Sequence, residues 1–407
     1  MHTIMPSHWL PIPDPKEILM TSSNSSIVSR LDAVIDGAIA AERIVGAVVL
    51  VALDGKTIYC RAAGLADRDA GTEMRTDAIF RLASVSKLFS AAAALALVSR
   101  GILDLDRPIT EWLPAFTPTF EGRPALITLR HLLSHSAGLS YGFFEPEGGP
   151  LAQAGVSDGM DRADLTLADN IRRLAGVPLS SAPGSAFRYS LGIDVVGAVI
   201  EAATGLALPE SIRKLVTEPL RLKDTGFALS DPSRVTAAYA DATPRPRRMH
   251  EPDCLPLLPG MASVMMDPSR VFDTKAFPSG GAGMVGTALD VLQLIEALRQ
   301  GGGDMMTADH ASVMARDQIA GIDIEGSPGW GYGLGFSVLR DSQAAGVAEP
   351  AGTWRWGGAY GHSWFTDPSN GLTVVALTNT AFEGMSGAGR FSTDISRAIY
   401  AAMAEAS

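Results

Sequence analysis

Apolar residues recur at helical spacing in the first well-patterned stretch of the chain, from Ser26 to Ala41. A period of this kind predicts an amphipathic helix. Two runs rich in β-forming residues follow, residues 46–53 and 56–61, with Asp54-Gly55 between them. Asp-Gly in this setting is a strong hairpin signal. Residues 1–25 show no comparable pattern and are predicted to form an irregular N-terminal arm.

An alanine-rich apolar run, Leu88 to Val98, contains no Gly or Pro and predicts a buried helix that ends near Gly101. Beyond it, as far as residue 279, the signals are mostly short helices interrupted by Pro and Gly. The predicted helices are Thr128 to Ser134, Leu165 to Leu174, and Leu191 to Thr204 with Gly205 as the C-cap. Residues 241–267 carry five prolines and little periodicity, which predicts a long loop or a lid.

Strand-like runs dominate towards the C-terminus, after one helix that Thr287 caps with Asp290 as its capping partner. The runs are residues 333–339, 353–357, 362–367 and 372–378, and a last helix is predicted from about Thr393 to Ala404. Strands and helices at both ends, with a helical insertion between them, imply one sheet built from both termini. We predict an α/β (α+β) domain from residues 26–100 and 280–407, with an antiparallel sheet flanked by helices, and a mainly helical domain over residues 101–279.

Composition narrows the class of protein. The chain has 407 residues, of which 46% are hydrophobic and 19% charged, which is typical of a soluble globular enzyme. A net charge of −11 disfavours nucleic acid and anionic membranes as partners. Cys60 and Cys254 offer neither a disulfide framework nor zinc spacing, which favours a reducing compartment. The first residues lack the pattern of a signal peptide, and no window is long and apolar enough to span a bilayer, so we expect a cytoplasmic protein.

The strongest chemical candidate lies at the start of the alanine-rich run, in Ser84-Val85-Ser86-Lys87. If the helix begins at about Ser84, then Ser84 and Lys87 lie one turn apart on the same face, with the serine at the positive end of the helix. A serine hydroxyl is a weak nucleophile until a base takes its proton, and a desolvated lysine can do this. Taken alone, Ser-x-x-Lys is common and is more often ordinary surface helix.

Two further stretches could complete a site. Tyr189 lies in a turn that leads into a helix, where a neighbouring lysine would favour its phenolate and let it act as a base or an acid. Trp356-Gly357-Gly358-Ala359 joins two strand-like runs, and its glycines would let the backbone approach a bound acyl group. Read separately, the first is a half-buried helix-start tyrosine and the second a tight hairpin.

Taken together and in this order, Ser84-Val85-Ser86-Lys87, Tyr189-Ser190-Leu191 and Trp356-Gly357-Gly358 resemble the family VIII carboxylesterases. These are serine esterases of the class C β-lactamase and penicillin-binding-protein superfamily. The resemblance covers nearly everything from about residue 28 to the C-terminus. It implies the serine β-lactamase/DD-peptidase-like fold, with the active site in the crevice between the two predicted domains.

The resemblance also implies roles for individual residues. Ser84 would be the acylated nucleophile, with Lys87 and Tyr189 sharing the work of general base and acid. The backbone N–H groups of Ser84 and Ala359 would form the oxyanion hole. Substrate contacts would come from Trp356, Gly357, Gly358 and Tyr141.

Two departures from the β-lactamase pattern bear on the substrate. Trp356 stands where β-lactamases of this superfamily carry the lysine of Lys-Thr-Gly, and Leu191 stands where they carry the asparagine of Tyr-x-Asn. Both changes remove groups that hold a β-lactam's carboxylate and amide, so the resemblance implies a less polar ester. No metal or organic cofactor is expected.

Other motifs compete with this interpretation. Gly138 to Gly142 and Gly155 to Gly159 both match the Gly-x-Ser-x-Gly nucleophile elbow around Ser140 and Ser157, but neither follows a strand as an elbow requires. Gly281 to Gly286 matches Gly-x-Gly-x-x-Gly without the βαβ setting of a dinucleotide site, which favours a tight glycine turn near the active-site floor.

The histidines show no metal pattern. His131 and His135 have helical i, i+4 spacing but no further ligand nearby, and His362 falls close to the predicted oxyanion strand with no role defined by sequence.

We therefore predict a serine carboxylesterase that hydrolyses short-chain esters through a Ser84 acyl-enzyme. The alternatives with the same residues are an acyltransferase and a weak β-lactamase or DD-peptidase-like hydrolase. A non-catalytic, penicillin-binding-like scaffold is the alternative of a different class, and the intact Ser84, Lys87 and Tyr189 count against it.

Overall fold

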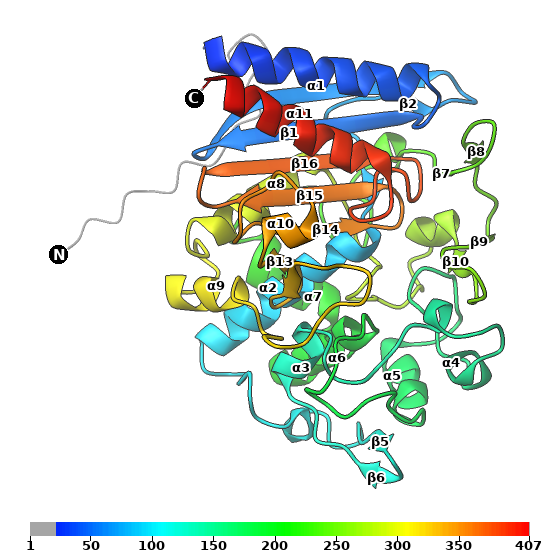
Figure 1. The fold of residues 1–407 in the computed structure, drawn as a ribbon. Helices are drawn as coiled ribbons and strands as arrows, with labels where there is room; N and C mark the ends of the chain where they lie inside the picture. The colour runs from blue at the N-terminus through cyan, green and yellow to red at the C-terminus, as the bar shows by residue number, and fades with distance from the viewer. Residues whose placement is uncertain (1–21, 407) are drawn as a thin grey trace.

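A single antiparallel sheet of eight strands organises the computed structural model, which describes residues 22–406 (Figure 1). Its strands, in spatial order, are β12 (Trp330–Tyr332), β13 (Ser337–Leu339), β14 (Trp354–Gly358), β15 (His362–Asp367), β16 (Leu372–Thr378), β1 (Gly46–Leu53), β2 (Lys56–Asp67) and β3 (Thr72–Glu73). The N-terminal strand β1 pairs with the C-terminal strand β16, with Val49 opposite Ala376. This confirms the prediction of one sheet built from both termini.

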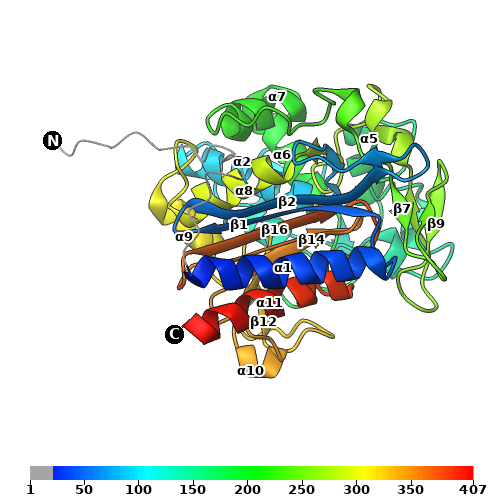
Figure 2. The ribbon, with the colours of Figure 1, turned by 90° about the horizontal axis from the view of Figure 1, so that it is seen from above.

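Both faces of the sheet are covered by helices, which explains why β1 and β16 are apolar at nearly every position. Val49 and Val51 of β1 pack with the helices α1 (Ser22–Ala40) and α11 (Arg390–Ala406), which lie side by side across one face (Figure 2). Val48 and Leu50 point to the other face, where α2 (Ser86–Ser99) and α8 (Ala288–Arg299) lie. Alternate residues of one strand thus serve two separate apolar layers.

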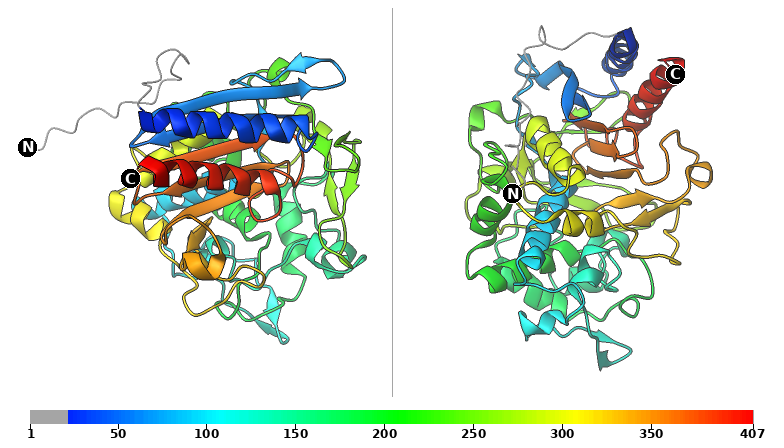
Figure 3. Two further views of the ribbon diagram at one scale, coloured as in Figure 1. Left: turned by 45° about the horizontal axis from the view of Figure 1, so that its top comes forward. Right: turned by 90° about the vertical axis from the view of Figure 1, so that its left-hand side faces the viewer.

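The region between α2 and α8 is built from short elements, as predicted (Figure 3). Its helices are α3 (Leu129–Leu133), α4 (Pro150–Gln153), α5 (Leu167–Ala175), α6 (Gly192–Thr204) and α7 (Leu208–Ile212). Gly205 caps α6 with a φ of 69°, the left-handed conformation that the sequence predicts there. After α8 come α9 (Ala308–Met314) and α10 (Ser342–Ala345).

Several boundaries differ from the sequence predictions. The run 333–339 is not one strand: it forms the turn and the second strand, β13, of a hairpin whose first strand is β12. Gly335 in the turn has a φ of 103° and lies so close to α2 that a Cβ on it would be 2.7 Å from the Cβ of Ala91. The Pro-rich stretch 241–267 contains short paired strands. These are β8 (Arg247–Arg248), which pairs with β7 (Tyr239–Ala240), and β9 (Asp253–Leu255), which pairs with β10 (Val264–Met266).

Two further predictions need correction near the helix ends. Thr287 caps α8 by accepting a hydrogen bond from Asp290 N, but the Asp290 carboxylate accepts from Asp224 N and Thr225 Oγ1 instead of completing a capping box. The predicted N-terminal arm lies outside the described residues up to residue 21, and its last four residues already belong to α1.

One apolar cluster runs through both predicted domains. It joins β1 and α2 to α3, α5 and α6 and to α8, with α2 at its centre and nearly every α2 side chain buried. The domain boundaries at residues 100 and 280 therefore stay a prediction. Within residues 22–406 no single helix is both long and apolar enough to cross a bilayer, and α6 passes that test only jointly with Leu208–Thr217, from which it is bent by 80°.

Candidate active site

Ser84 lies in a 3₁₀ turn, Ala83–Val85, that connects the short strand β4 (Phe80–Arg81) to α2. The residue before it, Ala83, has a φ of 43°, a conformation that costs energy for a residue with a Cβ. The surroundings hold this turn in place. Leu82 N donates to Met284 O at 2.9 Å, and β4 pairs with β11 (Val285–Gly286).

Two buried side chains, Arg81 and His362, also hold this segment in place through hydrogen bonds. The Arg81 guanidinium donates to Pro268 O at 2.7 Å and to Thr236 O at 2.6 Å. The His362 ring bonds through Nε2 to Arg81 O at 2.8 Å, and burial lowers the pKa of His362 to about 4. A neutral His362 therefore acts as a fixed support for the Ser84 turn, which gives it the role that the sequence did not define.

Lys87 and Tyr189 both meet the Ser84 hydroxyl. Lys87 Nζ donates to Ser84 Oγ at 3.1 Å, and Tyr189 OH donates to Ser84 Oγ at 2.7 Å. Lys87 Nζ also donates to Gly281 O at 2.8 Å. The structure thus brings Tyr189, which is distant along the chain, next to Ser84 and Lys87, which lie one helical turn apart. This is the grouping that the sequence predicts. Their catalytic roles stay a prediction.

Burial shifts the pKa values of Lys87 and Tyr189, the two partners of Ser84, in opposite directions. Burial lowers the pKa of Lys87 to about 7, because a charged ammonium is poorly solvated there. Burial raises the pKa of Tyr189 above its usual value, although its hydrogen bond to Ser84 opposes the shift. The sequence interpretation that lysine would favour the phenolate is therefore not what this environment provides. These directions favour a neutral Lys87 that can accept a proton and a protonated Tyr189 that can donate one.

The site has a buried acidic partner that sequence reasoning missed. Asp194 of α6 accepts a hydrogen bond from Ser279 Oγ at 2.6 Å, and its negative charge opposes the drop in the pKa of Lys87. A Cβ on Gly281 would lie 2.7 Å from Asp194 Oδ2, so glycine at this position leaves the carboxylate in place. The signal was a lone carboxylate within the otherwise apolar start of α6.

A cavity of about 250 Å³ opens in front of Ser84 and is mostly apolar. Five of the residues with predicted roles line it: Ser84, Tyr189, Trp356, Gly357 and Ala359. Gly358 is not among the lining residues, and the roles themselves stay predictions. Its other lining residues, none of them predicted, are Phe143, Phe144, Met160, Leu257, Val264, Phe382, Met385 and Ser386. Such walls suit an apolar acyl or alcohol group better than a charged one.

Tyr141 is buried beside Tyr189 and Lys87. Its side chain is 2% exposed, stacks on Phe143, and lies 5.2 Å from the Tyr189 ring, centre to centre. Lys87 Nζ lies 5.3 Å from the centre of its ring. Tyr141 is not among the residues that line the cavity, and its contact with substrate stays a prediction.

The two glycines after Trp356 allow close backbone contacts on two sides of β14: Gly358 approaches the Ser84 turn, and Gly357 approaches the neighbouring strand β15. A Cβ on Gly358 would lie 2.4 Å from Leu82 O, and a Cβ on Gly357 would lie 2.3 Å from His362 O. The close partner of Gly358 is the protein's own backbone at the Ser84 turn, and the approach of these glycines to a bound acyl group stays a prediction.

Gly358→Ala is accordingly expected to push β14 away from the turn and to lower the free energy of unfolding by about 1–3 kcal/mol, as overpacking does. Urea denaturation measures this change. Gly37→Ala is the matched control, because a Cβ there meets nothing within 4 Å. It should leave stability unchanged or raise it by about 0.5–1 kcal/mol. Equal stability of the two variants would contradict the close approach.

The competing motifs do not form a second site. Ser140 Oγ donates to Tyr141 O, and Ser157 Oγ donates to the Asp161 carboxylate, so neither serine contacts a histidine or lysine base. His131 Nδ1 accepts from Thr128 N in a capping box, and His135 Nδ1 contacts Ser190. Among residues 22–406 no group of three or more His, Cys, Asp or Glu side chains could hold a metal ion.

A serine hydrolase with the β-lactamase and penicillin-binding-protein fold accounts for these features. The sequence profile of the beta-lactamase family matches residues 31–396, and the chain belongs to this family. It is 50% identical to the esterase EstB of Burkholderia gladioli over 366 residues, 89% of this chain and 93% of that protein.

Solved structures of other proteins share the fold of this chain. EstCE1, described as a hydrolase with promiscuous acyltransferase activity, superimposes with a TM-score of 0.91 at 44% identity, over 93% of this chain and all of that one. A mutant of the simvastatin synthase LovD from Aspergillus terreus shares the fold, with a TM-score of 0.73 at 21% identity over 94% of this chain and 98% of that one.

Proposed function

We propose that the protein is a family VIII carboxylesterase that hydrolyses short-chain, uncharged esters through an acyl-enzyme on Ser84. The observation that carries the proposal is the pair of hydrogen bonds from Lys87 and Tyr189 to Ser84 Oγ, at the floor of an apolar cavity. The similarity to EstB over most of both chains supports the same conclusion.

In the first half of the reaction, Ser84 Oγ attacks the ester carbonyl while neutral Lys87 takes the hydroxyl proton. The N–H groups of Ser84 and Ala359 would stabilise the oxyanion that forms, since both residues line the cavity. The alcohol then leaves with a proton donated by Tyr189, which Lys87 can resupply. In the second half a water molecule attacks the acyl group by the same route and restores Ser84.

The uncharged substrate follows from what faces the cavity. Trp356 presents an aromatic ring in place of an ammonium group, and Leu191 is fully buried at the start of α6. Leu191 offers no hydrogen bond, and the Trp356 indole N–H carries no charge to pair with a carboxylate. We therefore propose only weak activity on β-lactams.

An acyltransferase is the second candidate. It would use the same acyl-enzyme, and the apolar walls that exclude water could hold an alcohol as the acceptor. The acyltransferase activity named for EstCE1 favours testing it. Product analysis with a competing alcohol separates the two reactions.

Turnover of p-nitrophenyl acetate and butyrate, with a chromogenic cephalosporin alongside, tests the proposal. We expect both esters to be hydrolysed and the cephalosporin to turn over at least about 100-fold more slowly, because a site that lacks a polar partner group binds such a ligand poorly. A folded protein that turns over neither ester, or prefers the cephalosporin, would contradict it.

Tyr189→Phe is expected to lower kcat/KM by about 100-fold for esters of aliphatic alcohols, because these leaving groups need a proton from a general acid. p-Nitrophenolate leaves without one, so the loss on p-nitrophenyl acetate should be much smaller. Parallel kinetics on ethyl and p-nitrophenyl esters of one acid provide the measurement. An equal loss on both esters would exclude the acid role.

The rate should depend on pH through Lys87. Because neutral lysine is the active form, kcat/KM for a neutral ester is expected to rise as pH increases through about 7. Asp194→Asn should shift this rise to lower pH, since the carboxylate favours the charged lysine. A rate that falls over the same range would contradict the assignment.

The pH dependence of the free energy of unfolding tests the lowered pKa of Lys87 independently of activity. The pKa of Lys87 is about 7 in the folded protein, whereas the ordinary value for a lysine side chain, which applies to the unfolded chain, is 10.5. Between these values unfolding takes up a proton, so the Lys87 contribution makes the free energy of unfolding increase with pH. Lys87→Met should remove this contribution.

A further inference from the structure

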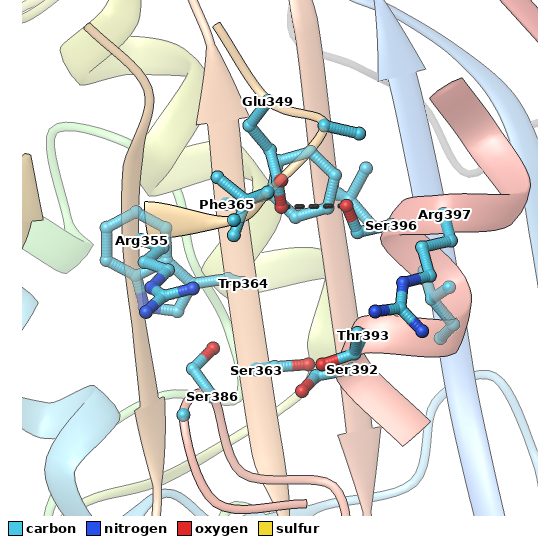
Figure 4. Close-up of a pocket in the computed structure, with 16 residues that line it drawn as sticks. Glu349, Arg355, Ser363, Trp364, Phe365, Ser386, Ser392, Thr393, Ser396 and Arg397 are labelled. Atoms are coloured by element: carbon cyan, nitrogen blue, oxygen red, sulfur yellow. Dashed lines mark hydrogen bonds between the residues drawn. The ribbon is translucent and has the colours of Figure 1, made fainter. Parts of the chain in front are cut away.

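A second cavity, of about 370 Å³, lies between the sheet and α11 (Figure 4). Side chains alternate along β14, so Trp356 points into the catalytic cavity while Arg355 points to the other face. The floor of this rear cavity is β14 and β15, and its walls are α11 and the segment 346–349 after α10. The polar side chains that line it and carry the argument are Glu349, Arg355, Ser363, Ser386, Thr393 and Arg397.

Arg355 is the least expected of these side chains. Within residues 22–406 its guanidinium forms no hydrogen bond and no ion pair, although it is mostly buried. Its central carbon lies 3.6 Å from the centre of the Trp330 ring. Stacking of this kind occupies the face of the guanidinium and leaves its N–H edge available to a ligand. Burial lowers the pKa of Arg355 to about 10, so the group remains charged at neutral pH.

Further donors surround this edge. Ser363 is 7% exposed and lies on the same face as Arg355, two residues before Phe365, which is opposite Arg355 in the sheet. Arg397 extends from α11 towards the same space, with the Thr393 hydroxyl beside it (Figure 4). Within the described part of the chain, the side chains of Ser363, Thr393 and Arg397 have no hydrogen-bond partner.

One carboxylate, Glu349, faces the cavity and its negative charge acts on Arg355, but it offsets only one of the two arginine charges. Glu349 Oε1 accepts a hydrogen bond from Ser396 Oγ at 2.7 Å, and no ion pair joins Glu349 to either arginine within residues 22–406. Two guanidinium groups against one carboxylate leave the cavity net positive. The N–H edge of an arginine matches the two oxygens of an oxyanion in a pair of charge-assisted hydrogen bonds.

We propose that the rear cavity binds a small oxyanion, a carboxylate or phosphate group held by Arg355, Arg397 and Ser363. The chemistry is shared by organic acids and by phosphate. It is separate from ester hydrolysis, because neither arginine faces the catalytic cavity.

Calorimetric titration with inorganic phosphate and with succinate, at constant ionic strength set by chloride, tests the proposal. We expect one saturable site per chain for at least one of the two, and their relative affinities then identify the preferred group. Arg355→Gln should weaken binding by about tenfold or more, since it removes charge-assisted hydrogen bonds. Arg172→Gln, at an exposed position of α5 far along the chain, is the matched control and should leave the affinity unchanged.

Two further experiments distinguish loss of the oxyanion site from a folding defect and from binding in the catalytic cavity. Arg397→Gln changes an exposed side chain of α11 and should weaken binding even if Arg355→Gln folds poorly. Ser386 lines both cavities, so the titration is repeated after Ser84 has been phosphonylated, or on Ser84→Ala if no adduct forms. Binding should persist. Absence of saturable binding, binding that both arginine variants leave unchanged, or loss of binding on phosphonylation would overturn the proposal.

Discussion

Ser84→Ala is expected to lower kcat/KM for p-nitrophenyl acetate by about five orders of magnitude, because the nucleophile cannot be replaced by water held in the same geometry. The fold should survive, since Ser84 Oγ accepts hydrogen bonds from two side chains that keep other contacts, Lys87 with Gly281 and Tyr189 with its ring neighbours. Steady-state kinetics with a thermal melt measure both.

The matched control is Ser86→Ala, two residues further on. Ser86 is also buried, but its hydroxyl accepts from Met284 N and does not face the cavity. It should cost stability and leave most of the activity. If Ser84→Ala retained more activity than Ser86→Ala, the nucleophile assignment would be wrong.

Lys87→Ala is expected to lower kcat by about three to four orders of magnitude while KM changes little, because the residue acts on the proton of Ser84 and does not line the substrate cavity. The remaining activity should lose its rise with pH near 7. Kinetics of the variant across the pH range provide the measurement.

Lys87→Arg is the informative comparison. It keeps a positive charge but cannot lose its proton at neutral pH. If Lys87 served only as a fixed cation, the arginine variant would retain activity; as a base it should be as inactive as the alanine variant. Restored activity in Lys87→Arg would therefore contradict the base role.

The local part of this site was predictable because it depends on short-range geometry. Ser84 and Lys87 are one helical turn apart, and an apolar run without Gly or Pro can only be placed as a buried helix. The hairpin at Asp54-Gly55 and the cap at Gly205 follow from backbone preferences that a few residues determine. Strand-like runs and helices at both ends of the chain, with a helical insertion between them, were enough to expect one sheet from both termini.

The remaining features depend on contacts between distant segments. Asp194 and Gly281 meet Lys87 only because α6 and the turn before β11 pack against α2. Leu257 and Val264 reach the cavity from a Pro-rich stretch whose path no periodic pattern defines. Tyr141 follows a turn that resembles the family's pocket, but its own depth of burial is decided by Phe143 and Tyr189 packing over it.

The same reason explains why the direction of the Tyr189 pKa was not predictable. Proximity to lysine can be inferred from a motif, but the extent of burial around the pair cannot. Here burial acts on both groups, and it lowers the pKa of Lys87 while raising that of Tyr189.

The most direct test of the Ser84 acyl-enzyme is the intact mass of the protein after treatment with a fluorophosphonate, for the wild type and for Ser84→Ala. We predict one adduct on the wild type, none on Ser84→Ala, and loss of ester turnover in proportion to labelling. An adduct that persists on Ser84→Ala would move the nucleophile to another serine, such as Ser140 or Ser157, and would contradict the account. A folded wild type with neither adduct nor turnover would favour a non-catalytic scaffold.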